Sequence, residues 1–196
     1  MHRGSGPMVV RMFARLLVFL LIAGAASAGD WFGRVQAPPR AAYPFALTDP
    51  SGNRVRLADL KGKVLLIAFG FTHCPGICPA MLAQLTTAVR EAGGSVEIVF
   101  ISVDPDRDTP QRMGAFTGRF AGPVLGLTGT RGELAAAAKG FRATAKPTAG
   151  PGELIDHTTD VTVVDRNGRV RLTYRFDQLA QSAAIAADLR RLLAEG

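Results

Sequence analysis

Cysteine is scarce in this chain: two of the 196 residues are cysteines, and both lie in the segment Cys74-Pro75-Gly76-Ile77-Cys78. A disulfide between them would close a very short loop, which constrains the unfolded chain little compared with a long-range bridge. Short cysteine spacings fit redox and metal chemistry better than an inert role. A purely structural function for the pair is therefore disfavoured.

A clustered basic face and internal repeats are also lacking. The formal net charge is +7, and three arginines with no acid in residues 1–28 leave 7 − 3 = +4 for the rest of the chain. The remaining basic residues are scattered, whereas a nucleic-acid-binding protein gathers them on one face. No nucleic-acid partner is expected.

The N-terminus has the three parts of a secretory signal. Arg3, Arg11 and Arg15 precede the apolar run 16–23, and small residues follow at 25–28. The run is short for a membrane span of about 20 residues, so we expect residues 1–28 to be a cleaved signal peptide and the mature protein to be exported, to the periplasm in a Gram-negative host. The alternative is an uncleaved anchor on the periplasmic side of the inner membrane, and membrane association is expected only then. No cysteine follows the apolar run, so a lipid-anchored form is not expected.

The rest of the chain divides into two parts. Residues 29–42 contain Pro38-Pro39 and few apolar residues, which is typical of a linker. Residues 43–196 have the length of one ordinary domain. Turn sequences at 49–52 and 165–168 predict two hairpins. Strands are predicted at 43–48, 53–57, 63–71, 96–103, 124–127, 161–164 and 170–174, and helices from 79 to the glycines at 93–94, from 110, at 130–141 and at 178–194.

This order predicts an α/β fold. Strands that alternate with helices, followed by a hairpin and a closing helix, indicate an α/β sandwich with a mixed central sheet. The continuously apolar run 63–71 suits a central strand covered on both faces. We therefore expect a thioredoxin-like three-layer sandwich to which an N-terminal β-hairpin is added. Thr109 and Thr130 have the sequence context of helix N-caps, and Asp177 is a candidate cap for the last helix.

The two thiols lie where the central strand meets the next helix. Open α/β sheets place their sites at the carboxyl ends of strands. A helix N-terminus favours the thiolate over the thiol, and thiolates bind soft metals and attack disulfides. We expect Cys74 in the turn and Cys78 in the first helical turn, close enough to share a metal or to oxidise.

Three segments of the chain resemble one family. They are Phe69-Gly-Phe-Thr-His-Cys-Pro-Gly-Ile-Cys-Pro79, Ile101-Ser-Val-Asp-Pro-Asp-Arg-Asp-Thr-Pro110, and Asp156-His157 before Val161-Thr-Val-Val-Asp165. Together they are similar to the Sco/SenC family, whose members are exported or anchored thioredoxin-fold copper proteins that assemble the binuclear copper site of cytochrome c oxidase. The resemblance runs from about residue 43 to the C-terminus.

The resemblance implies the metal site. Cys74, Cys78 and His157 match the family's copper ligands, and Asp104 matches an acidic position near that site. Two thiolates suit Cu(I), and an added imidazole suits Cu(II), so one copper per monomer is expected in either oxidation state. Asp104 either supports the ligands from a second shell or caps the turn that follows it, and both interpretations stay open. His73 adjoins Cys74, but neighbouring side chains of extended backbone point apart, so His73 is not counted as a ligand.

Two functions remain open. The first is a metallochaperone that delivers copper to the oxidase, or prepares its site, with the copper-receiving subunit and a periplasmic copper donor as partners. The second is a thiol-disulfide reductase that keeps the recipient's cysteines reduced. Residues 155–160 lack the proline that usually faces the dithiol of thioredoxin-like oxidoreductases, which favours copper. Nothing resembles the threonine and arginine of a peroxiredoxin-like peroxidase. The Gly- and Pro-containing stretch 143–154 is expected to be a mobile loop over the site.

Overall fold

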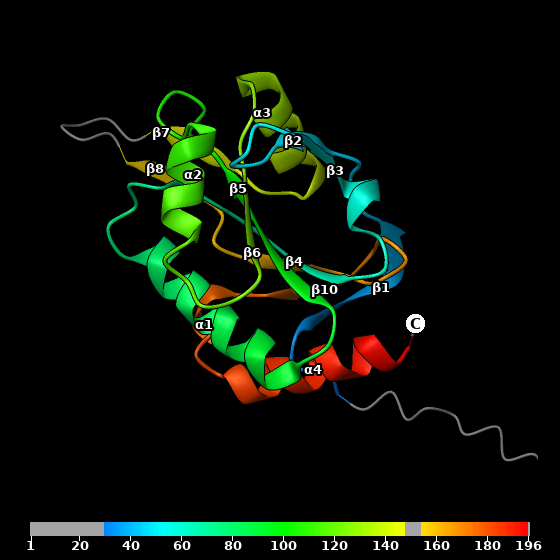
Figure 1. Cartoon of the computed structure of the whole chain (residues 1–196). Helices are drawn as coiled ribbons and strands as arrows, with labels where there is room; N and C mark the ends of the chain where they lie inside the picture. The colour runs from blue at the N-terminus through cyan, green and yellow to red at the C-terminus, as the bar shows by residue number, and fades with distance from the viewer. Residues whose placement is uncertain (1–29, 148–153, 196) are drawn as a thin grey trace, which may run out of the picture. The chain divides into compact units, whose positions relative to one another are not determined.

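The most apolar stretch of the chain, Val64–Gly70, forms β4, the central strand of a six-stranded sheet (Figure 1). The computed structural model describes residues 30–147 and 154–195. The other strands are β1 (Arg34–Ala41), β2 (Ala46–Thr48), β3 (Arg54–Arg56), β5 (Val96–Ser102), β6 (Val124–Leu127), β7 (Ala145–Pro147), β8 (Ile155–His157), β9 (Val161–Val164) and β10 (Arg169–Tyr174). The helices are α1 (Ile77–Ala92), α2 (Pro110–Thr117), α3 (Arg131–Gly140) and α4 (Ser182–Ala194), with 3₁₀ turns η1 (Leu57–Leu60) and η2 (Phe176–Gln178).

The main sheet is mixed, as the sequence predicts. Its strand order is β1-β10-β9-β4-β5-β6. β4, β5 and β6 run parallel, and β9, β10 and β1 join them through antiparallel pairings. β4 therefore separates a parallel half from an antiparallel half, and its carboxyl end is where α1 begins.

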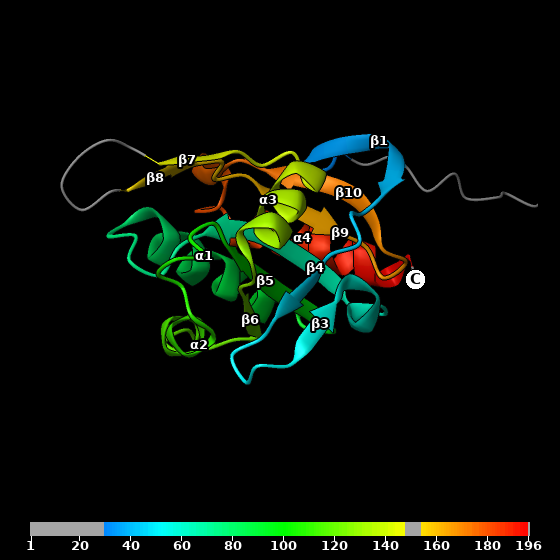
Figure 2. The same cartoon turned by 90° about the horizontal axis from the view of Figure 1, so that it is seen from above.

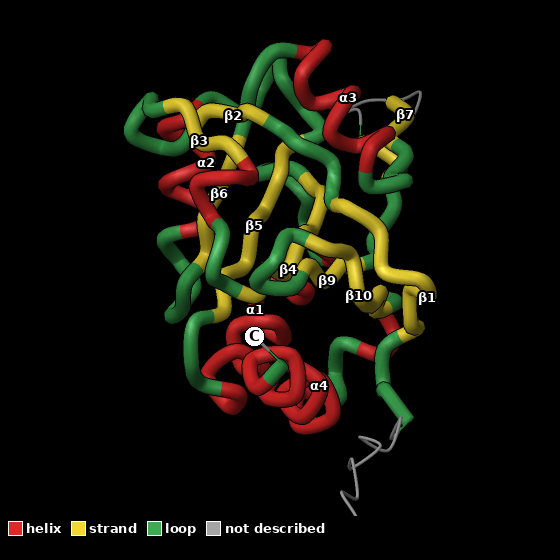
Figure 3. Tube along the Cα trace, turned by 90° about the vertical axis from the view of Figure 1, so that its right-hand side faces the viewer, coloured by secondary structure: helices red, strands yellow, loops and turns green. Residues whose placement is uncertain are grey.

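Side chains of β4 alternate between two hydrophobic cores. Leu66 and Ala68 belong to the core with α1, α2 and α4, whereas Leu65 and Ile67 belong to the core with α3, η1 and β2. Figure 3 shows α1 and α4 on one side of the sheet and α3 with β2 and β3 on the other. Every residue of β4 is buried, so both faces of the sheet are covered by a layer of other elements. The predicted three-layer sandwich and the added hairpin are therefore confirmed.

Two of the three predicted helix caps are present. The Thr109 hydroxyl accepts a hydrogen bond from the N–H of Arg112, and Thr130 forms a capping box with Glu133. Asp177 does not cap the last helix, because residues 176–178 form η2 and α4 begins five residues after Asp177. Its carboxylate pairs with Arg175 instead.

The interpretation of residues 29–42 as a linker is wrong for most of their length. Residues 34–41 form β1, which pairs with β10 at the edge of the sheet. The register shifts between Val35 and Arg40, around the two prolines that suggested a linker. An edge strand with a bulge is where a sheet tolerates proline, so the composition resembled a linker although the backbone is paired.

The predicted signal peptide, residues 1–28, lies outside the described residues. Among the helices of the described part of the chain, none is long and apolar enough to cross a membrane.

The segment 143–154, predicted as a mobile loop, contains a strand. This strand, β7, pairs antiparallel with β8, which begins just after the segment, so that Ala145 lies opposite His157 and Pro147 opposite Ile155. They project at the end of the domain where α1 begins (Figure 2). Residues 148–153, between these strands, lie outside the described residues. β7 and β8 therefore form a two-stranded ribbon that presents His157.

Candidate metal centre

The two cysteines at the junction of β4 and α1 differ in their exposure to solvent. Cys74 lies in the turn, where its N–H donates to the carbonyl of Phe71 at 3.3 Å, and it is half-buried. Cys78 lies in the first turn of α1 and is fully buried. Its backbone N–H lies 3.4 Å from Cys74 Sγ. The helix N-terminus thus directs one of its unpaired N–H groups at the outer sulfur, as the sequence predicts.

A glycine at the end of β4 makes room for the inner sulfur. A Cβ at Gly70 would lie 2.8 Å from Cys78 Sγ and 2.6 Å from the ring of Phe100. Both contacts are closer than van der Waals packing allows, so only glycine fits here without a shift. This role of Gly70 was not predicted from the sequence. The signal was an isolated glycine within a strand pattern, which often marks a close approach.

His157 reaches the thiols from the end of β8. Its Nε2 lies 3.8 Å from Cys78 Sγ, although the two residues are 79 positions apart. Its Nδ1 lies 2.9 Å from the carbonyl oxygen of Thr158, which can only accept a hydrogen bond. We therefore assign the proton to Nδ1, which leaves the lone pair of Nε2 facing Cys78.

The ribbon that carries His157 is held at its base. The backbone N–H of Thr144 donates to Thr158 Oγ1 at 3.0 Å, and the two hydroxyls lie 3.2 Å apart. The edge of the His157 ring also meets the ring of Phe71, with 5.6 Å between centroids. The contacts at the base of the ribbon and the contact with the Phe71 ring therefore hold the imidazole in this position.

The buried position of Cys78 opposes its ionisation. Burial raises the pKa of this thiol, and a hydrogen bond from the backbone of Phe71 offsets the effect only in part. The helix N-terminus was expected to favour the thiolate. At Cys78 burial outweighs that effect, so this sulfur is a protonated thiol near neutral pH until a metal or an oxidant displaces the proton.

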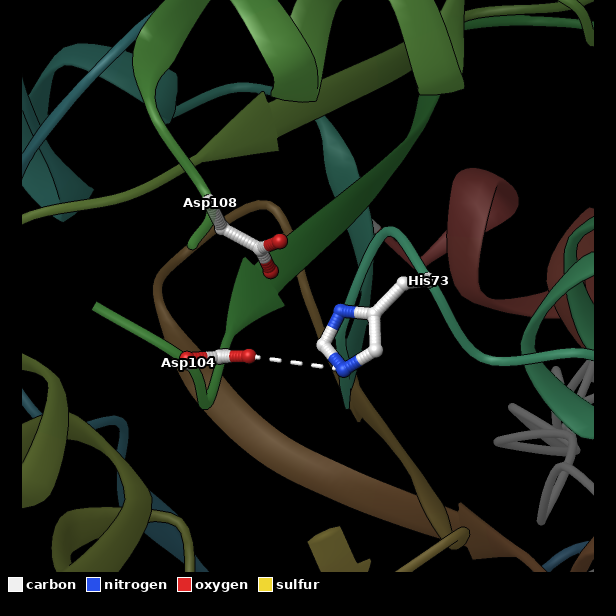
Figure 4. A group of neighbouring side chains, drawn as sticks. All are labelled: His73, Asp104 and Asp108. Carbon is white, nitrogen blue, oxygen red and sulfur yellow. Dashed lines mark ion pairs between the residues drawn. The ribbon is translucent and has the colours of Figure 1, made fainter. Parts of the chain in front are cut away.

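His73 and Asp104 form a separate cluster with Asp108 (Figure 4). His73 Nε2 lies 3.6 Å from Asp104 Oδ2, and the His73 ring stacks near Phe71 at 4.5 Å between centroids. Phe71 thus contacts both histidines. His73 faces the two aspartates.

The two aspartates already have partners. Asp104 pairs with Arg107. Asp108 accepts from Thr72 Oγ1 and Ser102 Oγ, both at 2.7 Å, and from the backbone N–H of Thr72. The carboxylates therefore tie the loop before Cys74 to the end of β5, and we assign the cluster to this structural task rather than to a metal.

The role of Asp104, which the sequence left open, is partly resolved. Its carboxylate bridges His73 and Arg107, whereas its backbone carbonyl accepts from Asp108 in the following turn. Its link to the thiols therefore passes through His73, the neighbour of Cys74. Asp108 was not singled out from the sequence, although its place four residues after Asp104 and just after a buried strand was the available signal.

The donor set fits a soft or borderline metal. Two cysteine sulfurs and one imidazole nitrogen are the ligand types that suit Cu(I) and Cu(II) in one site. The residues come from the turn after β4, from α1 and from β8, so the site exists only when the sheet and the ribbon are both formed.

Comparisons with known proteins agree with this arrangement. The sequence model described as SCO1/SenC matches residues 34–194. The mitochondrial SCO1 homologue of Homo sapiens is 35% identical over 156 residues, which cover 74% of this chain and 50% of that protein. SenC of Rhodobacter capsulatus is 37% identical over 127 residues, 62% of this chain and 58% of that protein. This chain thus spans about half the length of the curated relatives it matches.

Solved structures are similar over most of the domain. Bradyrhizobium japonicum ScoI with copper bound is 38% identical with a TM-score of 0.69, and the match covers 78% of this chain and 99% of that one. Arabidopsis thaliana ScoI with copper bound is 32% identical with a TM-score of 0.68, over 75% of this chain and 98% of that one. With its fold, its thiol pair and these matches, the chain belongs to the SCO1/SenC family.

Proposed function

We propose that the protein binds one copper ion per monomer through Cys74, Cys78 and His157, and that it delivers this copper to the binuclear site of cytochrome c oxidase or prepares that site. The observation that carries the proposal is the 3.8 Å approach of His157 Nε2 to Cys78 Sγ. An imidazole aimed at a buried thiol beside a second cysteine is a metal-ligand arrangement.

Each residue contributes a different property. Cys74 is half-exposed and offers the sulfur that a donor or acceptor protein reaches first. Cys78 is buried and holds the ion away from solvent. His157 is held by the Thr158 carbonyl with Nε2 free to bind, an orientation that raises ligand basicity. Copper is the cargo of the site, and its positive charge keeps both sulfurs deprotonated while it is bound.

The relatives support the choice of metal and pathway. Two similar structures hold bound copper, and another, 27% identical, belongs to a member of the Sco family of cytochrome c oxidase assembly proteins. By analogy we propose the copper-receiving oxidase subunit as a partner, with a periplasmic copper donor as a second one. The predicted signal at residues 1–28 supports export to the periplasm, as a free protein or as one anchored to the inner membrane.

A thiol-disulfide reductase is the second candidate. Cys78 N–H lies 3.4 Å from Cys74 Sγ, and Cys74 is half-exposed, so an incoming disulfide would reach this sulfur first. A disulfide switch is identified in BsSco, the relative that is 27% identical. The reductase function requires Cys74 and Cys78 but not His157, so His157 distinguishes the two candidates.

Copper binding by the reduced protein tests the proposal. We expect one copper per chain, and essentially none after Cys74 and Cys78 are oxidised to a disulfide, because oxidation removes both thiolates. Cys74→Ser or Cys78→Ser should abolish tight binding, since a hydroxyl is a poor ligand for a soft metal. His157→Ala should lose most Cu(II) affinity and keep some two-coordinate Cu(I), whereas the neighbouring His73→Ala should bind as the parent does.

Elemental analysis, the thiolate-to-Cu(II) absorption band and the EPR spectrum measure these outcomes. Stoichiometric copper retained by the oxidised protein would contradict the site. An unchanged EPR spectrum in His157→Ala would remove His157 from the ligand set.

Complementation of a host that lacks the protein separates delivery from reduction. If copper delivery is the task, oxidase activity is lost, is partly restored by added copper through mass action, and is not restored by His157→Ala. A pure reductase predicts rescue by a membrane-permeant thiol and full complementation by His157→Ala. The second pattern would transfer the assignment to the reductase.

A further inference from the structure

A small cavity lined by residues of β1, β9 and β10 gathers three arginines. Its volume is about 70 Å³, and β1 contributes Arg34 and Arg40 to its wall. Arg142, just after α3, is the third. This volume exceeds the roughly 10–15 Å³ that a single water needs, so the cavity has room for a small ion.

Within the described part of the chain, the arginines of this cavity have no carboxylate partner. Arg40 Nη1 donates to the carbonyl of Ala41 at 3.4 Å, whereas Arg40 Nε is buried without a hydrogen-bond acceptor. Burial and the positive charge of Arg142 lower the pKa of Arg40. Two guanidinium groups that repel each other and leave a buried donor unpaired are costly, and an anion between them removes both costs.

Arg142 occupies a backbone position that an arginine rarely takes. Its φ is +62°, and it follows Phe141, the C-cap of α3, in a turn in which its N–H donates to the carbonyl of Lys139. Helices usually place glycine there, because the Cβ of other L-residues makes the left-handed region unfavourable. A strained residue whose side chain lines a cavity indicates a function for that side chain.

The remaining lining is polar. Thr158, Thr162 and Thr173 line the cavity together with Gln36, and these side chains can donate to an oxyanion. One carboxylate, Asp160, also lines the cavity, so the four charged residues sum to a net charge of +2. A phosphate group is the oxyanion that paired guanidinium forks recognise best, through parallel N–H···O bonds.

We propose that this cavity binds one phosphate-sized oxyanion, either free inorganic phosphate or the phosphate of a lipid headgroup. The site is independent of copper, because none of its arginines belongs to the metal centre. It touches the metal centre only through Thr158, the residue after His157.

Calorimetric titration of the full chain with inorganic phosphate, at an ionic strength held constant with chloride, tests the proposal. We expect saturable binding of one phosphate per chain. Arg40→Gln and Arg142→Gln should each weaken it at least tenfold, whereas Arg119→Gln, which removes an exposed charge outside the cavity, should bind as the parent does. Binding that survives in both cavity variants, or no binding beyond that of chloride, would overturn the proposal.

Two additions keep the test decisive. Arg142→Gly suits the left-handed backbone, so it should keep the fold and raise the unfolding midpoint in chloride while losing phosphate binding. Titration with glycerophosphoglycerol, the soluble headgroup of phosphatidylglycerol, identifies the source: tighter binding than inorganic phosphate indicates a lipid, and weaker binding indicates the free ion. In either case the affinity must depend on Arg40 and Arg142.

Discussion

Among single residues, Gly70 has the most direct influence on the inner thiol. It is the last residue of β4, and its missing side chain is what lets Cys78 Sγ and the Phe100 ring meet above the strand. Phe71 follows it and touches the rings of both His73 and His157. Gly70 and Phe71 therefore shape the metal centre, although neither residue offers a ligand.

Replacement of Gly70 by alanine should disturb the metal centre. The added methyl group would lie 2.6 Å from Phe100 and 2.8 Å from Cys78 Sγ, and such overpacking costs about 1–3 kcal/mol. We expect a lower free energy of unfolding in urea and weaker Cu(II) binding, because Cys78 must move relative to His157. Gly76→Ala is the matched control, since a Cβ there meets nothing within 4 Å. Equal stability of the two variants would refute the steric argument.

At the level of elements, the hairpin β2–β3 is joined to α3 by an ion pair. Arg54 Nη2 lies 2.5 Å from Glu133 Oε1, and Glu133 also accepts from the N–H of Thr130 in the capping box. These two hydrogen bonds lower the pKa of Glu133 to about 2 from an ordinary value of 4.5. One carboxylate thus completes the helix start and fastens the added hairpin to the layer that α3 forms.

This carboxylate predicts a pH-dependent contribution to stability. Because the pKa of Glu133 is lower in the folded state, its charge stabilises the fold to the full extent when the pH is above about 4.5. This contribution is lost as the pH falls from about 4.5 through about 2. Glu133→Gln keeps a capping side chain but removes the charge. Because Glu133 is one-third exposed, we expect a loss of less than about 1 kcal/mol at pH 7.

Urea unfolding at pH 7 and pH 2 measures the difference, which should be much smaller at pH 2. Asp106→Asn is the control, because its ion pair with Arg131 is fully exposed and such pairs contribute little. A difference between Glu133→Gln and the parent that is as large at pH 2 as at pH 7 would show that the charge is not its cause.

The sequence predicted the position of His157 near the thiols, but it did not predict that the strands β7 and β8 pair to carry it. The sequence places a histidine before the strand at 161–164, and the structure brings it to Cys78. The Gly- and Pro-containing composition of 143–154 suggested a loop. Pairing of Ala145 with His157 depends on contact across that stretch, which composition does not encode.

On the scale of the whole molecule, the start of the described chain is fastened to its last helix. The backbone N–H groups of Phe32 and Gly33 donate to Asp188 at 3.2 and 2.9 Å, and the hydroxyl of Tyr174 donates to the same carboxylate at 3.1 Å. The side chain of Asp188 is buried. Trp31 packs beneath Arg191, with 4.0 Å from the guanidinium carbon to the ring centroid. The packed part of the described chain therefore begins at Trp31, the third residue after the predicted signal peptide.

Loss of this carboxylate should loosen the N-terminal segment. Asp188→Ala leaves two backbone donors and one hydroxyl without an acceptor, at about 1–3 kcal/mol for each buried group that stays unpaired. We expect a drop of at least about 2 kcal/mol in the free energy of unfolding and faster hydrogen exchange at Phe32 and Gly33. Tyr174→Phe removes one donor only and should leave that exchange unchanged. Unaltered exchange in Asp188→Ala would contradict the role of the clamp.

The sequence by itself determined the local features of this protein. The apolar run of β4, the threonine caps of α2 and α3, the hairpin turns and the thiol pair at a strand–helix junction all depend on residues close in the chain, and each was predicted correctly. The three-segment resemblance added the family and the pairing of His157 with the thiols.

Only the tertiary structure decided what depends on distant residues. Pairing with β10 made residues 34–41 a strand rather than a linker. Burial made Cys78 a protonated thiol, against the effect of its helix N-terminus. The approach of Gly70 to Cys78 and the gathering of Arg40 and Arg142 around one cavity join separate elements. The physical reason is common to all four: backbone hydrogen bonding, steric contact, desolvation and charge repulsion depend on distance in space, and local sequence sets that distance only within one element.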